Sequence, residues 1–467
     1  MIMSKQDSVA PTERDPRDTS AVGLNPVKRD AMGAAMRVLT KITGSELAER
    51  YNLRQTIDRV TYEGTKTGFK TLGAATRGFQ KVAGSGAPKR LPDSPAKNSD
   101  FFDLTPTDDQ QMIVETVREL AAEILRPAAH DADAAAATPA DLTKRAAELG
   151  ITLINVPEEL DGAAGERGAV TNTLVAEALA HGDMGLALPI LAPSGVAVAL
   201  TQWGTDAQQK TYLPAFTGEQ VPGAAVVVAE PRALFNPFEL ETKAVRSPSG
   251  YKLNGVKSLV PAAASAELFI VAAELDGRPA FFIVESDTKG LVVEADPSMG
   301  LRAAGIGRIQ LTDVAVPESA LLGEGDVEQR VKEYADAVRL ARLGWASLAV
   351  GTGQAVLDYV IPYVNEREAF GEPISHRQAV AFMVANIGIE LDGLRLVTLR
   401  GASRAEQGLS FAREAALARK LATDKGMQIG LDGVQLLGGH GFTKEHPVER
   451  WYRDLRAIGV AEGVVLI

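Results

Sequence analysis

The chain has 467 residues with a net charge of −11, and 45% of its residues are hydrophobic. This composition is ordinary for a soluble globular protein of several domains and argues against a general nucleic-acid-binding function. The chain contains no cysteine, which excludes disulfides, a cysteine nucleophile, iron–sulfur clusters and cysteine-ligated zinc.

The first hundred residues divide into a polar tail and a basic extension. Residues 1–27 are polar with scattered Pro and Gly, lack the apolar stretch of a signal peptide, and are predicted to be disordered. Residues 28–90 carry 13 Lys and Arg against 5 Asp and Glu, with apolar and basic residues interleaved. That pattern fits a basic amphipathic segment that contacts a membrane surface or a partner, or an accessory helical segment packed on the acidic remainder of the chain. Together with a Pro- and Ser-rich linker, this basic helical extension covers residues 28–100.

Residues 101–222 are predicted to form a helical N-terminal domain. Thr107-Asp-Asp-Gln110 comes directly before apolar residues at helical spacing, so a capped helix is expected to begin there. Pro127 is expected to limit this helix, because proline lacks the backbone N–H that a helix interior needs. We find no run of about 18 apolar residues and therefore predict no membrane span.

The pattern changes at Gly223, where short β-rich runs punctuated by Gly and Pro replace the helical periodicity. Residues 223–325 are therefore predicted to form a compact β domain, with strands in the runs Ala224–Ala229, Tyr251–Leu253, Leu268–Ala272, Ala280–Val284, Leu291–Glu294 and Gly307–Leu311. Residues 326–467 return to helical periodicity and predict a C-terminal α domain. Short loops join its long amphipathic stretches, 327–369, 376–407 and 409–437, which favours an antiparallel bundle. Pro362 is expected to kink the first stretch.

Four strings in the C-terminal part carry the most specific information. Residues 366–374 read Glu-Arg-Glu-Ala-Phe-Gly-Glu-Pro-Ile, residues 435–442 read Gln-Leu-Leu-Gly-Gly-His-Gly-Phe, residues 446–454 read His-Pro-Val-Glu-Arg-Trp-Tyr-Arg-Asp, and Glu462-Gly463 follows. With the helical–β–helical order, these strings resemble the acyl-CoA dehydrogenase family from about residue 105 to residue 467. The resemblance implies an α+β multidomain fold with an N-terminal helical domain, a β-barrel-like middle domain and a C-terminal four-helix bundle. It also implies FAD as the cofactor and a tetramer, and we expect a cytoplasmic protein.

By this resemblance, six residues match positions that contact the flavin dinucleotide. Arg367 matches the arginine that reaches the flavin pyrophosphate of a neighbouring subunit, and a planar guanidinium suits phosphate. Phe370 and Gln378 match positions at the adenosine half of the same cofactor. Gln435, Gly438 and Gly439 match the next family segment around that cofactor. Glycine at such positions lets the backbone approach a ligand closely.

Glu462 falls where most of the family keeps its catalytic carboxylate. The family reaction removes the α-proton of an acyl thioester while the β-hydrogen leaves as hydride to flavin N5, so the resemblance implies an acyl-CoA substrate and Glu462 as the base. A carboxylate suits this task once acyl chain and flavin expel water around it. By the same analogy, the backbone N–H of Glu462 and a flavin hydroxyl would hold the thioester carbonyl. Arg342 matches a family arginine near the base and the thioester, with a simple helix salt bridge as the alternative.

The predicted β domain departs from the family at the positions that meet the flavin ring. The family has polar residues or a tryptophan there, and this chain has Ala229, Phe235, Leu259, Pro261, Ala304 and Ile306 instead. Each lost contact would weaken flavin binding by about 1 kcal/mol or more. Val464 replaces the threonine of the usual Glu-Gly-Thr, and family members normally run further than Ile467. The motifs that reach a neighbour's flavin are retained, whereas those that hold the chain's own flavin ring are degraded.

Three functions remain open from the sequence. The first is an FAD-dependent acyl-CoA dehydrogenase that forms a homo-tetramer and passes electrons to an electron-transfer flavoprotein. The second is a weakly flavin-binding or non-catalytic subunit of a hetero-tetramer with related subunits, and the third is an acyl-CoA oxidase.

Ala187 and Leu191 lie where larger or polar residues can close the family's acyl channel. No metal is expected, because no metal-ligand spacing relates the five histidines, His130, His181, His376, His440 and His446.

Overall fold

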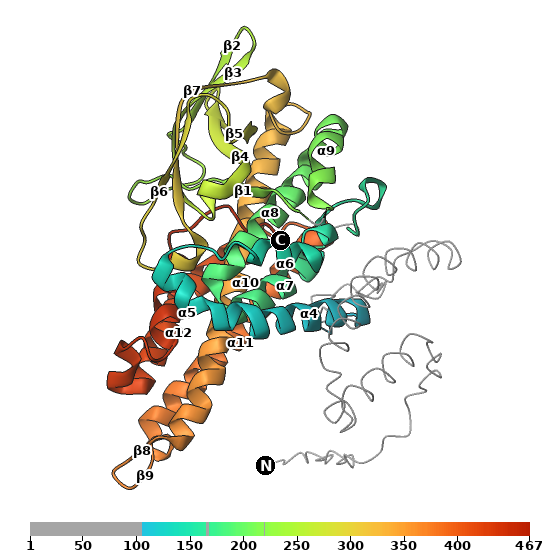
Figure 1. Ribbon diagram of the computed structural model, residues 1–467. Helices are drawn as coiled ribbons and strands as arrows, with labels where there is room; N and C mark the ends of the chain where they lie inside the picture. The colour runs from blue at the N-terminus through green and yellow to red at the C-terminus, as the bar shows by residue number, and fades with distance from the viewer. Residues whose placement is uncertain (1–104, 165–167, 219) are drawn as a thin grey trace, which may run out of the picture. The chain divides into compact units, whose positions relative to one another are not determined.

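The computed structural model describes residues 105–164, 168–218 and 220–467 (Figure 1). The polar tail and the basic extension expected in residues 1–100 lie outside the described residues. The N-terminal part of the described chain is helical, as expected. Its α-helices are α4 (Asp108–Leu120), α5 (Arg126–Ala135), α6 (Leu142–Glu148), α7 (Ala169–Gly182), α8 (Met184–Trp203) and α9 (Asp206–Tyr212).

The first helix begins at the predicted capping signature but does not end where we expected. The Thr107 hydroxyl accepts a hydrogen bond from Gln110 N, and the Gln110 side chain accepts one from Thr107 N, both at 3.2 Å. The expectation that Pro127 limits this helix is wrong. A π-helical turn, η1 (Ala121–Leu125), joins α4 to α5, so that Pro127 lies in the first turn of α5. At that position the missing N–H of proline costs little.

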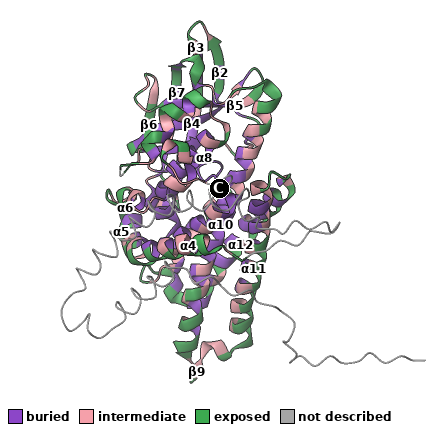
Figure 2. Cartoon of the chain, turned by 90° about the vertical axis from the view of Figure 1, so that its right-hand side faces the viewer, coloured by how far each residue is buried: buried purple, intermediate pink, exposed green. Residues whose placement is uncertain are grey.

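Helix α8 is the core helix of the N-terminal part. Its length and its mean hydropathy of 1.8 would allow it to cross a membrane, contrary to our reading of the sequence. However, 94% of this apolar window is buried inside the protein. The helix packs against α7, β1 and the 3₁₀ turn η6 (Arg302–Ala304), and Figure 2 shows it among buried residues. Its apolar composition is therefore explained by burial among other protein elements.

The middle part is a curled, seven-stranded mixed sheet. Its strand order is β1-β4-β2-β3-β7-β6, with β5 paired to β4; β1 and β2 run parallel to β4, and the other pairs are antiparallel. Five of the six predicted runs lie within strands of this sheet, and the run Ala224–Ala229 extends two residues beyond the end of β1. The sequence pattern missed β2, which is short and largely exposed. The strands are β1 (Gly223–Val227), β2 (Lys243–Ser247), β3 (Gly250–Val260), β4 (Ala266–Leu275), β5 (Arg278–Glu285), β6 (Leu291–Ala295) and β7 (Gly307–Val316).

The C-terminal part is again helical and packs on the N-terminal helices. Its α-helices are α10 (Val327–Glu366), α11 (Gln378–Glu406), α12 (Ala412–Leu437) and α13 (Val448–Ala457). A small hairpin, β8 (Glu368–Ala369) and β9 (Glu372–Pro373), joins α10 to α11. Helix α10 contacts α7, α11 and α12. Its approach to α7 depends on Gly351, where an added Cβ would lie 2.1 Å from the carbonyl oxygen of Glu177.

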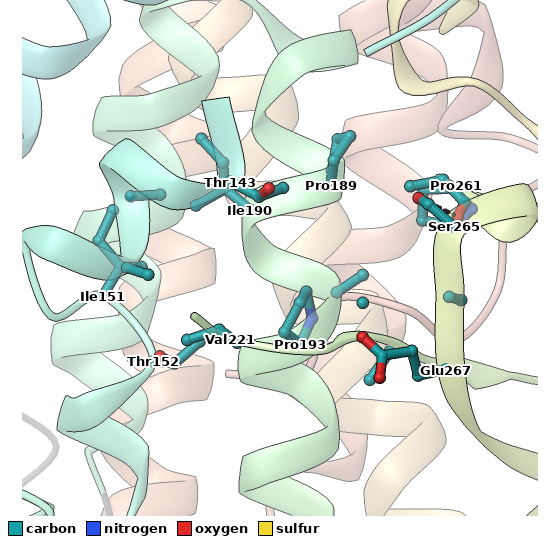
Figure 3. Close-up of a pocket in the computed structure, with 17 residues that line it drawn as sticks. Thr143, Ile151, Thr152, Pro189, Ile190, Pro193, Val221, Pro261, Ser265 and Glu267 are labelled. Carbon is teal, nitrogen blue, oxygen red and sulfur yellow. Dashed lines mark hydrogen bonds between the residues drawn. The ribbon is translucent and has the colours of Figure 1, made fainter. Parts of the chain in front are cut away.

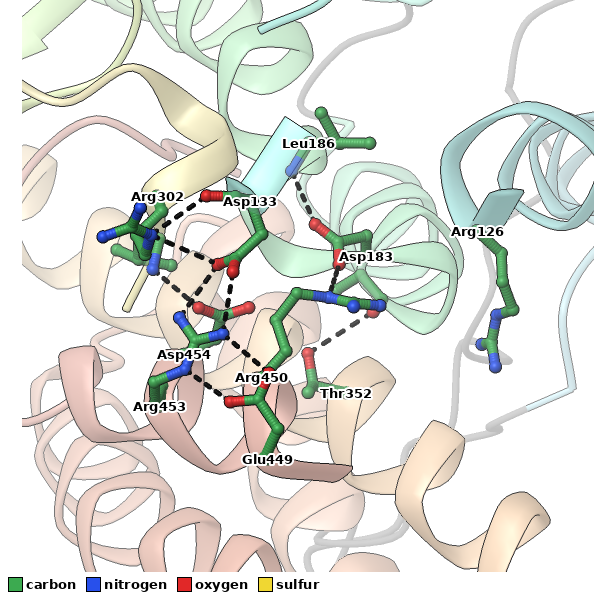
Figure 4. Close-up of polar contacts among 12 residues, drawn as sticks. Arg126, Asp133, Asp183, Leu186, Arg302, Thr352, Glu449, Arg450, Arg453 and Asp454 are labelled. Atoms are coloured by element: carbon green, nitrogen blue, oxygen red, sulfur yellow. Dashed lines mark hydrogen bonds and ion pairs between the residues drawn. The ribbon is translucent and has the colours of Figure 1, made fainter. Parts of the chain in front are cut away.

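Ion pairs fix α13 against the helices of the N-terminal part (Figure 4). Arg450 Nε donates to the buried carboxylate of Asp183 at 2.9 Å. Arg453 donates to both oxygens of Asp133, at 2.8 and 2.9 Å. Asp454 accepts a hydrogen bond from Leu301 N at 2.6 Å. Arg450, Arg453 and Asp454 therefore hold α13 in place against the rest of the fold.

The residues after α13 pass between α8, α10 and β1. Val464 N donates to Val226 O, and Trp345 Nε1 donates to Gly463 O, each at 2.9 Å. An added Cβ at Gly195 of α8 would lie 2.2 Å from Val464 O, and one at Gly344 of α10 would lie 2.2 Å from Val465 O. Val464–Ile467 are all buried. This segment, residues 461–467, is therefore held on several sides, and we call it the C-terminal segment.

Candidate functional site

Glu462 lies in the C-terminal segment at a position fixed by the neighbouring backbone. Gly463 pairs with Val227 through an isolated antiparallel bridge. Gly463 and Val464 both have positive φ, at 76° and 68°. A glycine adopts that conformation readily, whereas a β-branched valine is strained there. The strained turn directs the chain into the gap between α8 and α10, and Glu462 precedes it.

Two arginines hold the Glu462 carboxylate. Its side chain is 6% exposed. Arg342 of α10 donates from Nε to both carboxylate oxygens at 3.2 Å and from Nη2 to Oε1 at 2.8 Å. Arg419 of α12 donates from Nη2 to Oε1 at 3.4 Å and from Nη1 to Ile458 O. These contacts orient the carboxylate, and they must loosen before it can take a proton from a substrate.

From the sequence, Arg342 was expected near Glu462 only because of the family resemblance. Nothing in the sequence predicted that Arg419 contacts Glu462. Burial lowers the pKa of Arg419, while the nearby Glu462 opposes this shift. Arg419 belongs to an amphipathic helix rich in charged residues, and its partner is 43 residues further along the chain. No short-range pattern connects two such residues, so only the packing of α12 against the C-terminal segment shows the contact.

A buried ion pair supports the loop in which the family's polar positions are replaced. Lys257 of β3 donates to Glu230 Oε1 at 2.9 Å, and both side chains are at most 2% exposed. Glu230 also accepts from Glu241 N and Thr242 N, at 2.8 and 2.9 Å. Burial lowers the pKa of Lys257 to about 8, although Glu230 opposes this. The Glu230 carboxylate, which belongs to the residue before the 231–241 loop, therefore also binds the backbone at the end of that loop.

The replaced positions themselves offer hydrocarbon in place of polar groups. Ala229, Ala304 and Ile306 are all buried. Leu234, which precedes Phe235 in the same loop, is fully exposed and has φ of 54°. A leucine in this left-handed conformation is strained by about 1 kcal/mol or more. This strand-end region therefore has few of the polar contacts that a flavin ring would use.

A small cavity adjoins this region. It has a volume of about 230 Å³ and lies between α6, α8 and the part of the sheet near Pro261 (Figure 3). Apolar residues such as Ile190 and Pro193 form one wall, and Ser265 and Glu267 add polar groups. No predicted catalytic or flavin-binding residue is among the described residues that line it. Ala187 and Leu191, the predicted channel residues, are buried on α8 and do not line it either.

The predicted dinucleotide residues meet at a second hollow, which we call the hairpin groove. It has a volume of about 790 Å³ and is lined by Arg367, Phe370, Gln435, Gly438 and Gly439 among others. Of the six predicted residues, Gln378 alone is absent from this lining; it begins α11, one residue after the lining residue Arg377.

The hairpin groove has the chemistry of a phosphate and nucleoside site. Within the described residues, the guanidinium of Arg367 forms no ion pair, so it is free to contact an anion. An added Cβ at Gly438 or Gly439 would meet no atom within 4 Å, so the backbone there is accessible. Phe370 is 97% exposed, and the Arg377 guanidinium lies over its ring at 5.9 Å. These residues fit the pyrophosphate and adenosine half of a dinucleotide.

The hairpin groove lies at the C-terminal end of α10, whereas Glu462 contacts a residue nearer the middle of that helix. Arg342 contacts Glu462 in the first half of this 40-residue helix, whereas Arg367 follows its last residue. At 1.5 Å per residue, the two arginines are separated by about 38 Å along the helix axis. Figure 1 accordingly places the β8–β9 hairpin far from the large sheet. One dinucleotide cannot reach both places within a single chain.

Comparison with known proteins identifies the family. Models of the acyl-CoA dehydrogenase N-terminal, middle and C-terminal domains match residues 107–220, 225–314 and 335–465. The probable acyl-CoA dehydrogenase YngJ of Bacillus subtilis (strain 168) is 32% identical over 369 residues, which cover 78% of this chain and 96% of that protein. These matches place the chain among the oxidoreductases. It belongs to the acyl-CoA dehydrogenase family.

Solved structures agree with this assignment. Butyryl-CoA dehydrogenase from Megasphaera elsdenii has a TM-score of 0.71 at 27% identity, covering 78% of this chain and 96% of that chain. The FAD complex of PigA has a TM-score of 0.70 at 25% identity, covering 77% of this chain and 95% of that chain. The fold class expected from the sequence is thereby confirmed, and FAD is the cofactor found in relatives of this fold.

Proposed function

We propose that this chain is an FAD-dependent acyl-CoA dehydrogenase subunit in which Glu462 removes the α-proton of an acyl-CoA thioester. The observation that carries the proposal is the buried Glu462 carboxylate, fixed by Arg342 and Arg419 where α8, α10 and the sheet meet. When bound, the flavin supplies the acceptor for the substrate's β-hydride. In this proposal Glu462 takes the α-proton, and its backbone N–H would polarise the thioester carbonyl.

Substitution of Glu462 tests this proposal. We expect Glu462→Gln to lower acyl-CoA-dependent turnover by about 10²–10⁴-fold, because the amide cannot accept the proton. Glu318→Gln, at an exposed glutamate, is the matched control and is expected to retain activity. Unchanged turnover in a folded, flavin-loaded Glu462→Gln protein would contradict the assignment of the base.

We further propose that the hairpin groove serves the flavin of a neighbouring subunit. The separation of Arg367 from Glu462 along α10 supports this arrangement, as does the free guanidinium in the groove. In the simplest assembly, the neighbour is a second copy of this chain, and an electron-transfer flavoprotein accepts the electrons from acyl-CoA.

A second candidate is a subunit that lends the hairpin groove to a related partner and binds its own flavin ring weakly. Hydrocarbon side chains at Ala229, Ala304 and Ile306 favour this alternative, because they remove contacts to the ring. The flavin content of the purified chain decides between the two. One tightly bound FAD per chain in the isolated protein supports the homo-oligomer, whereas flavin that appears only with a second subunit supports the hetero-oligomer.

An oxidase differs from both in its electron acceptor. Steady peroxide production with acyl-CoA and oxygen would identify that activity, which we consider the third candidate.

A further inference from the structure

Two histidines and one glutamate meet in the loop between α12 and α13. One potential ligand atom from each of His440, Glu445 and His446 lies within 4.8 Å of the others. The sequence did not indicate this group, because the spacing between the two histidines matches no familiar metal motif. The group belongs to neither the proposed base nor the six predicted flavin-binding residues.

The local fold explains why these side chains converge. His440 lies in the 3₁₀ turn η9 (Gly438–Phe442), which ends α12. The chain then turns back, since Thr443 donates to His440 O from both its backbone N and its hydroxyl, at 3.1 and 2.9 Å. Pro447 precedes α13 and caps the loop at its other end. The turn thus returns Glu445 and His446 to the side of the loop on which His440 lies.

His446 is held in a definite orientation by its surroundings. Its Nδ1 lies 2.7 Å from the Tyr359 hydroxyl, and its ring meets the rings of Tyr359 and Tyr363 edge to face. The His440 ring is nearly perpendicular to it, with centroids 5.7 Å apart. Because Nδ1 is occupied by tyrosine, Nε2 is the nitrogen left for a ligand. A hydrogen bond to the second nitrogen is the usual support of a metal-bound histidine.

We propose that His440, Glu445 and His446 form a binding site for a divalent transition-metal ion of the zinc class. Two imidazoles and one carboxylate are a donor set that Zn²⁺ accepts, with a further position open to water or an anionic oxygen. Zinc bonds of about 2.1 Å join donors up to about 4.2 Å apart. The donors therefore need a small inward rotation, which His440 and Glu445 can make because both are exposed.

The position of the proposed metal site suggests which ligand could fill the remaining coordination position of the metal ion. His440 also lines the hairpin groove, as does Arg367, whose guanidinium forms no ion pair with any residue that the structure describes. A bound metal ion would add positive charge at the rim of that groove. An anionic oxygen in the groove, such as that of a phosphate, is a suitable further ligand.

Metal titration of the untagged full-length protein tests the site. After removal of metal with a chelator, we expect one Zn²⁺ or Co²⁺ to bind per chain, with visible absorption bands for Co²⁺. His440→Ala and Glu445→Gln are the primary variants, because both residues are exposed and their substitution should not disturb the fold. Circular dichroism checks that each variant is folded. Each is expected to weaken metal binding at least tenfold. Tyr359→Phe, which removes only the support of His446, is expected to weaken it by about 10–100-fold.

The control is His130→Ala, because His130 is exposed and lies on α5, outside the cluster. It is expected to leave metal binding unchanged. Binding of less than one ion per chain, or equal affinity in the His440→Ala and wild-type proteins, would overturn the proposal. The measurement needs no flavin and no turnover, so its outcome is independent of the proposed enzyme activity.

Discussion

Asp454 illustrates how much a single residue contributes to the junction between the helical parts. It is buried beside Asp183, Arg450 and Arg453, and it accepts a hydrogen bond from Leu301 N. Burial is the main cause that raises the pKa of Asp454, from an ordinary value of 3.8 to about 8, and the neighbouring Asp183 adds to it. The folded protein therefore holds a proton at this carboxyl over a range in which the unfolded chain has lost it.

This shift predicts a pH-dependent effect of Asp454→Asn. Between about pH 4 and pH 8 the folded state binds more protons than the unfolded state, so the carboxyl makes folding less stable as pH rises. The asparagine has no such titration and can still accept from Leu301 N. From pH 5 to pH 9 we expect the variant to gain at least about 1.4 kcal/mol of unfolding free energy relative to wild type. Denaturant unfolding at both pH values measures this, with the exposed Asp392→Asn as control; a pH-independent difference would contradict the shift.

Residues that carry the site differ in how far the sequence revealed them. Glu462 and Arg367 lie in strings that resemble those of a family, and Arg342 was proposed from the same resemblance; the structure brings Arg342 into contact with Glu462. Arg419 and the His440–His446 group were missed. Both depend on how the chain folds back on itself, through helix packing in one case and a tight turn in the other, and neither appears as a periodic pattern.

At the scale of elements, helix starts and the strand runs were predictable because they follow from local chemistry. The capping box at Thr107 is such a case. The error at Pro127 arose because a π-helical turn let the chain continue, which depends on packing rather than on residue type. Strand β2 was missed because Lys243–Ser247 is mostly polar and exposed, so it lacks the apolar alternation by which strands are recognised.

The close contact between α10 and the C-terminal segment predicts a sensitive position at Gly344. An added methyl group would lie 2.2 Å from Val465 O and 2.9 Å from Val465 Cγ1. We expect Gly344→Ala to destabilise the protein by about 1–3 kcal/mol and to lower turnover, because the segment that carries Glu462 must move. Thermal unfolding and steady-state assays measure the two effects.

Gly393 of α11 provides the matched control for this substitution. It is also helical, but an added Cβ meets no atom within 4 Å. Gly393→Ala is expected to be neutral or to stabilise the helix by about 0.5–1 kcal/mol. Equal effects of the two substitutions would show that the contact with Val465 does not constrain the site.

At the scale of the whole molecule, α11 presents an apolar surface that the described chain leaves uncovered. Phe382, Ile389 and Leu396 follow one another at seven-residue intervals, and all three are exposed. An exposed apolar stripe of this kind is typical of a contact with another subunit. It supports the proposal that neighbouring subunits bring the hairpin groove of one chain to the flavin of the other.

A charged substitution in this stripe should impair the assembly of subunits without unfolding the individual chain. We expect Ile389→Lys to shift the protein toward smaller oligomers in light scattering and to lower its flavin content, because the groove residues of the neighbour are lost. Val245→Lys, at an exposed apolar residue of β2, should change neither. An unaltered oligomer with Ile389→Lys would exclude this face as the subunit contact.

The threading of the C-terminal segment between α8 and α10 also bears on the order of folding. Glu462 contacts an arginine 120 residues upstream, and the nearby α13 is anchored to an aspartate 267 residues before it. Contacts of such long range form late, since large loops must close before they are made. A partly folded chain would thus contain every family string yet hold no oriented carboxylate, so the proposed proton abstraction would require the final docking of the chain.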